Sequence, residues 1–203
     1  VLRKDPLLAG SLRYNRLTEK IDVTKILWWN KEPCVLTNKG RKALRYFFEK
    51  YYGLFNEGVM DDALDLEAYS KEYHPICEYL ETLEWDGKER IRNVLKVYMG
   101  AEDSDLVYEM LKHFMMGALN RIYCPGCKFD EMLCLVGQQG AGKSTFFRFL
   151  ALDDQWFSDS LKNLNMEKPY ELLRGHWILE MSEMTAAISA KSIEETKSFL
   201  SRM

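Results

Sequence analysis

The residues with the clearest chemical meaning lie in one glycine-rich segment. Residues 137–144 read Gly-Gln-Gln-Gly-Ala-Gly-Lys-Ser and fit the spacing G-x-x-x-x-G-K-[ST]. Glycines at these positions let the backbone turn so that successive N–H groups point at phosphate oxygens. A glycine-rich turn that contains Gly-Lys-Ser by chance is the alternative, and the full match to the spacing disfavours it. The residues expected to contact the nucleotide are Gly137, Gln138, Gln139, Gly140, Ala141, Gly142, Lys143, Ser144 and Thr145.

Two side chains of this segment would carry the chemistry. Lys143 would reach the outer phosphates as a point charge, which gives it a catalytic role, and the hydroxyl of Ser144 would bind Mg²⁺. The segment therefore predicts a site for ATP and Mg²⁺.

A second chemical feature is a short apolar run that ends in a carboxylate. Trp177-Ile-Leu is followed by Glu180, with Glu183 three residues later. A nucleotide-hydrolysing site needs a carboxylate beside the phosphate loop, to orient Mg²⁺ or to polarise the attacking water. We assign catalytic roles to both: Glu180 lies on the metal side and would also assist the attack of water, and Glu183 would activate the water or support Glu180. The chain must turn after Glu180 if both serve, because residues three apart point to opposite faces of a strand. A solvated strand end is the alternative reading for each.

The loop needs elements on both sides to hold it. Residues 132–136 form an apolar run that predicts a buried strand, in which Cys134 would be a small core residue. Residues 145–151 continue as a helix whose N-terminus favours anions.

Two helices are expected before the loop, as a packed collar. Asp86 and Glu89 have the spacing of a capping box, and Gly100 would close the first helix. Ser104 is expected to cap the second helix. The side chains expected to be buried are Ile91, Val94, Leu95 and Tyr98 in the first helix and Val107, Met110, Leu111, Phe114, Ala118 and Leu119 in the second.

The first third of the chain predicts a small module. Residues 12–23 alternate loosely and indicate a hairpin. Thr37 or Asn38 would cap a helix that runs to Tyr52, and Asp61 would cap another helix over residues 62–73. A hairpin followed by short helices is similar to a winged-helix module. The apolar stripe of the first helix comprises Leu44, Phe47, Phe48, Tyr51 and Tyr52 and indicates core packing, with stacking on nucleic acid as the alternative.

Composition sets the broad class. The chain has 203 residues, 47% hydrophobic and 29% charged, as in ordinary globular proteins. It contains no apolar run suited to a membrane span, and its first residues, Val1-Leu-Arg-Lys-Asp, do not have the pattern of a signal peptide. Five cysteines at loose spacing favour reduced thiols and a cytoplasmic location. The net charge is −3, but residues 1–60 hold 12 Lys and Arg against 6 Asp and Glu, and the remainder holds 16 against 25. The mild positive charge of the first third allows contact with nucleic acid without requiring it.

Two close pairs of possible zinc ligands also occur. His74 and Cys77, and Cys124 and Cys127, each enclose two residues, as in zinc sites. About fifty residues separate the pairs, and a tight turn at Pro-Gly is enough to explain the spacing of Cys124 and Cys127. A structural zinc site is therefore the weaker alternative.

Four segments together resemble the virulence-associated protein E family of phage, plasmid and genomic-island primase-helicases, which is similar to superfamily 3 helicases. They read YHPICEYLETLEWDGKERI, NRIYCPGCKFDEMLCLVGQQGAGKSTFFRFLA, WFSDSL and ELLRGHWILEMSEM. The resemblance implies a bacterial or phage-encoded ATP-driven motor that assembles into a ring on single-stranded or forked DNA during replication. It also implies that Lys128 and Asp130 position the strand before the loop, and that Glu180 and Glu183 match the family's Glu-x-x-Glu segment.

We therefore expect an α/β chain with a mainly helical N-terminal region and a partial P-loop NTPase core with a parallel sheet. The expected parts are an N-terminal hairpin with helices (1–82), a helical collar (83–130) and the first half of the ATPase domain (131–203). About fifty residues follow the loop's helix, so the later sensor strands are expected to be missing, and any primase domain to precede Val1. Such a fragment would hydrolyse ATP weakly or not at all. The alternative is a non-catalytic DNA-binding or regulatory module with a vestigial loop.

Overall fold

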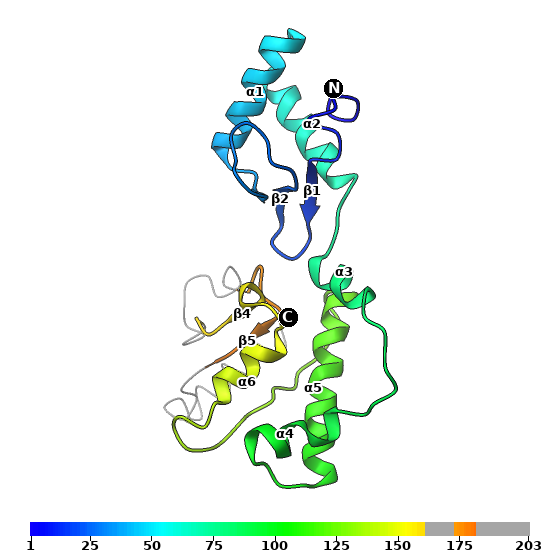
Figure 1. The fold of residues 1–203 in the computed structure, drawn as a ribbon, viewed down its shortest axis with the longest axis vertical. Helices are drawn as coiled ribbons and strands as arrows, with labels where there is room; N and C mark the ends of the chain where they lie inside the picture. The colour runs from blue at the N-terminus through cyan, green and yellow to red at the C-terminus, as the bar shows by residue number, and fades with distance from the viewer. Residues whose placement is uncertain (161–172, 182–203) are drawn as a thin grey trace. The chain divides into compact units, whose positions relative to one another are not determined.

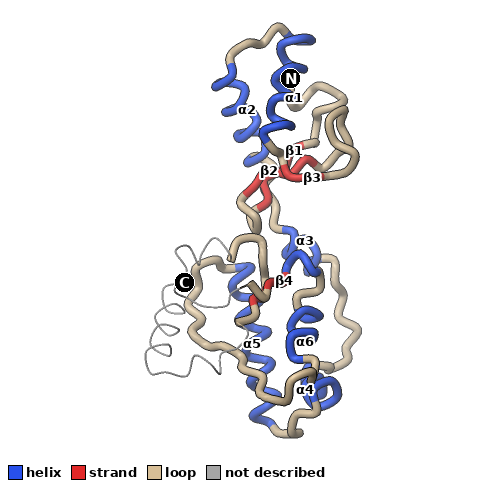
Figure 2. The backbone as a smooth tube through the Cα atoms, turned by 90° about the vertical axis from the view of Figure 1, so that its left-hand side faces the viewer, coloured by secondary structure: helices blue, strands red, loops and turns tan. Residues whose placement is uncertain are grey.

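The computed structural model describes residues 1–160 and 173–181 and has two compact units, Val1–Glu81 and Thr82–Met203 (Figure 1). Six α-helices, one three-stranded antiparallel sheet and one parallel pair of strands lie within the described residues (Figure 2). The α/β class expected from the sequence is therefore confirmed. In the part of the chain that the structure describes, none of the helices combines the length and apolar character that a bilayer span requires.

The first unit begins with the predicted hairpin. Strands β1 (Leu12–Asn15) and β2 (Lys20–Val23) pair antiparallel, and β3 (Cys34–Val35) pairs antiparallel with the other edge of β2. The Asn15 side chain accepts hydrogen bonds from the N–H groups of Leu17 and Thr18 at 3.0 and 3.2 Å, which shapes the turn. The hairpin prediction is confirmed.

Helix α1 (Asn38–Tyr52) has the ends that its sequence predicts. The Thr37 side chain accepts from the N–H of Gly40, and Gly53 ends the helix in the left-handed conformation at φ 63°. The stripe prediction is only partly right: Leu44, Phe47 and Phe48 are buried, whereas Tyr51 and Tyr52 are exposed. These two tyrosines lie in the last turn, where Tyr52 donates a hydrogen bond to Asp5 instead of entering the core.

Helix α2 (Glu57–Tyr69) lies against α1 and begins earlier than expected. Its cap is Asn56, whose side chain accepts from the N–H of Val59, so the prediction that Asp61 caps this helix is wrong. The Asp61 carboxylate is instead paired with Arg41 and Arg45 of α1, at 3.2 and 3.5 Å. The third helix, α3 (Pro75–Glu81), starts at its proline, a favoured first position.

The core of the first unit lies between the sheet and the first two helices. Leu8, Leu12, Val23, Leu44 and Leu64 are among its fully buried side chains. The core therefore joins the N-terminal segment, the hairpin and both helices into one body.

The second unit contains the remaining helices and the parallel strand pair. Helix α4 (Ile91–Met99) ends at Gly100, which has φ 64°, and α5 (Asp105–Tyr123) is capped by Ser104; both signals were predicted correctly. Helix α6 (Lys143–Leu150) follows the glycine loop, a short 3-10 turn spans Asp154–Trp156, and β4 (Phe157–Ser158) pairs parallel with β5 (Ile178–Leu179).

Two predictions about the helical collar are wrong in detail. Asp86 does not cap α4, because its carboxylate is held by Arg90 at 2.6 Å and by the N–H of Lys88, and α4 begins only at Ile91 without a side-chain cap. Leu95 and Leu111 are buried as expected. The residues of the predicted buried faces that are exposed are Ile91, Tyr98 and Met110.

The buried strand predicted for residues 132–136 is not formed. Strands β4 and β5 pair with each other, and among the described residues no strand pairs with this segment. Leu133 and Leu135 pack against the cluster around Leu111, while Val136 is 96% exposed and Cys134 is exposed rather than part of the core. The segment has the alternation of a strand, but the described residues offer no neighbouring strand with which it pairs.

Candidate phosphate-binding site

The glycine loop forms a tight turn that leads directly into α6. The N–H of Ala141 donates to the carbonyl of Gln138 at 3.3 Å, and Gly140 and Gly142 have φ of 81° and 78°. These φ values favour glycine, so the glycines of the motif are required by the backbone. Gly142 occupies the cap position of α6 and offers no side chain to it. Within the described residues, the first N–H groups of α6 thus have neither a helical partner nor a side-chain cap, which is the arrangement that binds anions at helix N-termini.

Lys143 lies across this loop. Its Nζ donates hydrogen bonds to the carbonyl oxygens of Gly137 and Gln138, at 2.9 and 2.8 Å. The ammonium charge is therefore held at the start of the loop, within reach of the same turn whose N–H groups would face a phosphate.

Ser144 and Glu180 are brought together from distant parts of the sequence. The Ser144 hydroxyl donates a hydrogen bond to Oε1 of Glu180 at 2.7 Å. The second carboxylate oxygen, Oε2, is buried, and within the described residues it has no hydrogen-bond partner. A hydroxyl beside a carboxylate with one unsatisfied oxygen is a suitable set of oxygen ligands for a hard cation such as Mg²⁺.

The strand pair fixes the position of Glu180. Glu180 follows β5 directly, and its N–H donates to the carbonyl of Ser158 at 2.8 Å, which continues the ladder with β4. The indole of Trp177 donates to the carbonyl of Ala118 in α5 at 3.0 Å. Because α6 contacts both strands, the start of α6 and the end of β5 are held side by side (Figure 1).

A contact that the sequence reading missed anchors the chain before the loop. The ring of Phe129 packs so closely against Gly117 of α5 that a Cβ atom at position 117 would lie 2.2 Å from the ring. The Arg121 guanidinium donates a hydrogen bond to the Phe129 carbonyl at 2.8 Å. The neighbours expected to position the loop, Lys128 and Asp130, form an ion pair with each other at 3.1 Å. The available signal was an isolated glycine inside a helical pattern, which often marks close packing.

The remaining candidate residues are less connected. Glu183 lies outside the described residues. Cys124 and Cys127 flank a turn in which the Cys127 N–H donates to the Cys124 carbonyl at 3.0 Å, as the Pro-Gly reading predicted. All five cysteines are free, and the described residues contain no group of three or more His, Cys, Asp or Glu side chains that could hold a metal ion.

Comparison with known protein families adds the decisive observation. Residues 80–203 match the model of the virulence-associated protein E-like domain, which covers more than half of the chain. The chain belongs to the virulence-associated protein E-like family. A comparison with curated proteins gives no match.

The match to the virulence-associated protein E-like domain includes the glycine loop and the residues of the candidate site. Lys143, Ser144 and Glu180 all lie inside it, as does a groove of about 530 Å³ beside the loop. Tyr98 of α4 lies on one wall of this groove, and Thr145 and Phe149 of α6 lie on another.

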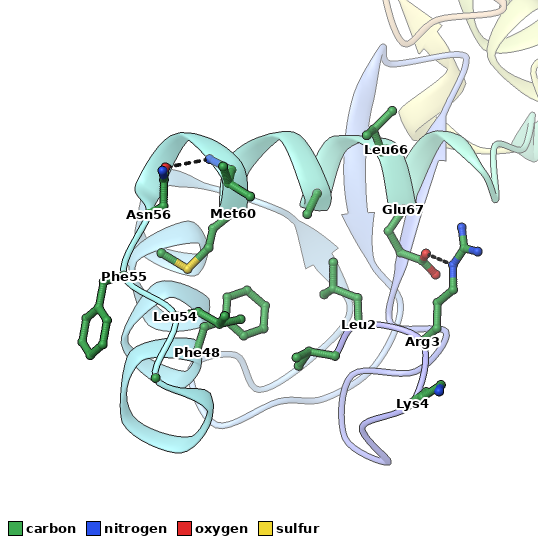
Figure 3. Close-up of a pocket in the computed structure, with 14 residues that line it drawn as sticks. Leu2, Arg3, Lys4, Phe48, Leu54, Phe55, Asn56, Met60, Leu66 and Glu67 are labelled. Atoms are coloured by element: carbon green, nitrogen blue, oxygen red, sulfur yellow. Dashed lines mark hydrogen bonds and ion pairs between the residues drawn. The ribbon is translucent and has the colours of Figure 1, made fainter.

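Most of the first unit precedes the virulence-associated protein E-like match and has a groove of its own, of about 630 Å³ (Figure 3). Leu2, Phe48 and Met60 point into it, whereas Phe55 points away (Figure 3). Glu67 lies at its edge and is paired with Arg3 at 2.6 Å and with Lys71 at 2.5 Å. Burial raises the pKa of the Glu67 carboxyl, but these two hydrogen bonds outweigh it, and the pKa lies below its ordinary value of 4.5.

Proposed function

We propose that the glycine loop binds Mg-ATP and that the chain is part of an ATP-dependent DNA helicase or primase-helicase of a phage, plasmid or genomic island. The observation that supports this most is the contact between Ser144 and Glu180, which leaves a buried carboxylate oxygen beside the loop with no partner among the described residues. Family membership agrees with it, because the resemblance described above is to primase-helicases. The protein would act in the cytoplasm on single-stranded or forked DNA, and the parent would assemble into a ring.

Each residue of the loop then has a defined task. The N–H groups of the turn and of the first turn of α6 would cradle the phosphates. Lys143 would leave the carbonyls of Gly137 and Gln138 and bind the outer phosphates, which attract an ammonium group more strongly than neutral carbonyls do. Ser144 and Glu180 would hold Mg²⁺, and this ion, when bound, would offset the negative charge of the phosphates.

Turnover needs more than these residues. Glu183 would orient the attacking water, and an arginine from a neighbouring subunit would stabilise the charge of the transition state, a contribution of roughly 10³-fold or more in P-loop enzymes that use such an arginine. We therefore propose that a single chain, without the arginine of a neighbouring subunit, binds the nucleotide but hydrolyses it slowly.

The test is calorimetric titration of the chain with Mg-ATP, beside Lys143→Ala. The expected result is binding that the substitution abolishes, because it removes the only side-chain cation of the loop segment 137–145. Lys112→Ala is the matched control, because this lysine lies on α5 and is paired with Glu109. Unchanged affinity in Lys143→Ala would refute the assignment, as would an equal loss in the control.

A second candidate function, DNA binding by the first unit, has an observation of its own. The outer face of α1 carries Lys39, Lys42, Tyr46 and Lys50 at helical spacing, and Tyr46 is largely exposed. Lys50 lies over the rings of Tyr46 and Tyr51, at 5.7 and 5.1 Å. Lysines beside exposed tyrosine rings suit a strand of nucleic acid, because the ammonium groups contact phosphates and the rings stack on bases.

The arginines of α1 have a different role. Arg41 and Arg45 are paired with acidic residues of α2, at 2.7 Å to Asp65 and 2.6 Å to Glu57. The lysines would therefore supply most of the charge for DNA. Replacing Lys39 and Lys42 with Gln should lower the salt dependence of single-strand binding by roughly 0.7 for each phosphate that is no longer neutralised. The same change at Lys112, which is paired with Glu109, should leave it unaltered; equal slopes for all variants would exclude this face.

A further inference from the structure

The groove beside the glycine loop has walls from two different segments of the second unit. Val94, Tyr98 and Met99 come from α4, and Gly142, Thr145 and Phe149 come from the loop and α6. Its volume of about 530 Å³ lies in the usual range of small-molecule sites, roughly 300–1,000 Å³. The groove is continuous with the phosphate loop, since Gly142 belongs to both.

Adjacent residues of α6 face different sides of the loop. Ser144 directs its hydroxyl to Glu180 at 2.7 Å, whereas Thr145, the next residue, lines the groove. Successive residues of a helix point about 100° apart. A ligand whose phosphates occupy the loop therefore has a metal side at Ser144 and a second side that opens into the groove.

The chemistry of the groove selects what can enter it. None of the described residues that line it is charged, so it does not suit a further phosphate group. Two aromatic rings stand on different walls and are largely exposed, Tyr98 by 74% and Phe149 by 76%. Exposed aromatic side chains in an apolar groove are typical of a binding surface, and flat heterocycles stack on such rings.

We propose that this groove binds the base of the nucleotide and that Tyr98 and Phe149 stack against it. The inference rests on the proposed function, because the phosphates of the same molecule must occupy the glycine loop. Among the described residues that line the groove, the side-chain polar groups are the hydroxyls of Tyr98 and Thr145. Recognition is therefore by stacking area, and purine triphosphates bind more tightly than pyrimidine triphosphates, with little distinction between adenine and guanine.

The test compares Mg-ATP with magnesium tripolyphosphate, which has the phosphates but no base. Tyr98→Ala and Phe149→Ala should each weaken Mg-ATP binding by roughly 5- to 150-fold, the range of base–aromatic stacking, and leave tripolyphosphate binding unchanged. Tyr98→Phe should bind Mg-ATP nearly as the parent does, because it keeps the ring. Phe55→Ala, an equally exposed aromatic in the first unit, is the matched control and should change neither ligand.

The outcomes separate the two proposals. Parent binding of Mg-ATP that is no tighter than binding of tripolyphosphate would overturn the base site and leave the phosphate site standing. Equal losses of both ligands in Tyr98→Ala would also overturn it, because they would indicate damage to the loop. If the parent binds neither ligand, the proposed function fails and the base site fails with it.

Discussion

The hydroxyl of Ser144 donates a 2.7 Å hydrogen bond to Glu180, a residue 36 positions later in the chain. This length is typical of hydroxyl–carboxylate contacts. The bond joins the first turn of α6 to the residue that follows β5, and it leaves Oε2 of Glu180 buried and, among the described residues, without a partner. A divalent cation bound at this site would be held by the hydroxyl of Ser144 and the carboxylate of Glu180.

Replacing Glu180 with Gln should weaken the binding of Mg²⁺ but leave the contacts to the phosphates unchanged. The amide oxygen still accepts from Ser144, but the negative charge that would attract Mg²⁺ is lost. We expect about a tenfold or greater loss of ATP affinity in the presence of Mg²⁺, by analogy with the loss of residues that support metal sites. Without Mg²⁺, ATP affinity should change little. Calorimetric titrations with and without Mg²⁺ measure both.

A matched control for this substitution is Glu131→Gln. Glu131 is exposed, and its Oε2 lies 3.7 Å from Nε2 of His113. It is not among the loop residues to which we assign a role. It should behave as the parent does in both titrations. An equal loss for Glu180→Gln with and without Mg²⁺ would contradict a metal role for this carboxylate.

Gly117→Ala should destabilise the second unit. The added Cβ would lie 2.2 to 2.5 Å from three ring atoms of Phe129, so the ring must move. Overpacking of this kind costs roughly 1–3 kcal/mol, against a gain of about 1 kcal/mol from the higher helix propensity of alanine. We expect a net loss of stability, measured as a lower midpoint of thermal unfolding by circular dichroism.

Gly58→Ala in α2 is the matched control, because the nearest atom to its added Cβ is 3.7 Å away. That variant should be as stable as the parent or slightly more stable. Adding Phe129→Leu to Gly117→Ala should restore part of the lost stability by making room. If the double variant is no better than Gly117→Ala alone, the ring contact is not the cause.

The stability of the first unit should depend on pH through Glu67. Its pKa lies below its ordinary value of 4.5, since the hydrogen bonds from Arg3 and Lys71 outweigh the effect of burial. A carboxyl with a lowered pKa in the folded state stabilises the fold above its unfolded pKa. This contribution is lost as the pH falls below about 4.5 and through the lower folded pKa.

Glu67→Gln should therefore lower stability at pH 7 by about 1–3 kcal/mol and reduce the further loss between pH 5 and pH 3. Urea unfolding at several pH values measures both effects. Glu72→Gln, at an exposed position of the same unit, should retain the pH dependence of the parent. A parent-like slope in Glu67→Gln would show that other groups govern the acid response.

Local sequence signals predicted the elements whose ends depend on one or two neighbouring residues. Thr37 and Gly53 bound α1, Ser104 caps α5, and Gly100 ends α4, because each makes its hydrogen bonds within a few residues of itself. The conformation of the glycine loop follows in the same way, from the two positive φ values that its glycines adopt.

Other predictions failed where distant residues compete for the same group. Asp61 has the sequence of a cap but is bound by arginines of α1, which the local pattern does not contain. Residues 132–136 have the composition of a buried strand, but a strand needs a partner, and β4 and β5 pair with each other. Tyr98 was expected in the core and is exposed beside the loop, so its helical spacing identified a face of α4 but not what the face contacts.

The packing of Phe129 against Gly117 also constrains the length of the segment that precedes the glycine loop. One end of the segment before the loop is fixed to α5 by this ring and by the bond from Arg121, and the other end enters α6 at Lys143. Between these two ends, no β-ladder among the described residues fixes the path of the chain. The number of residues from Phe129 to Gly137 therefore determines where the glycine loop lies relative to α5. Insertions or deletions there would be tolerated far less than in an ordinary surface connection, although the segment has no regular structure.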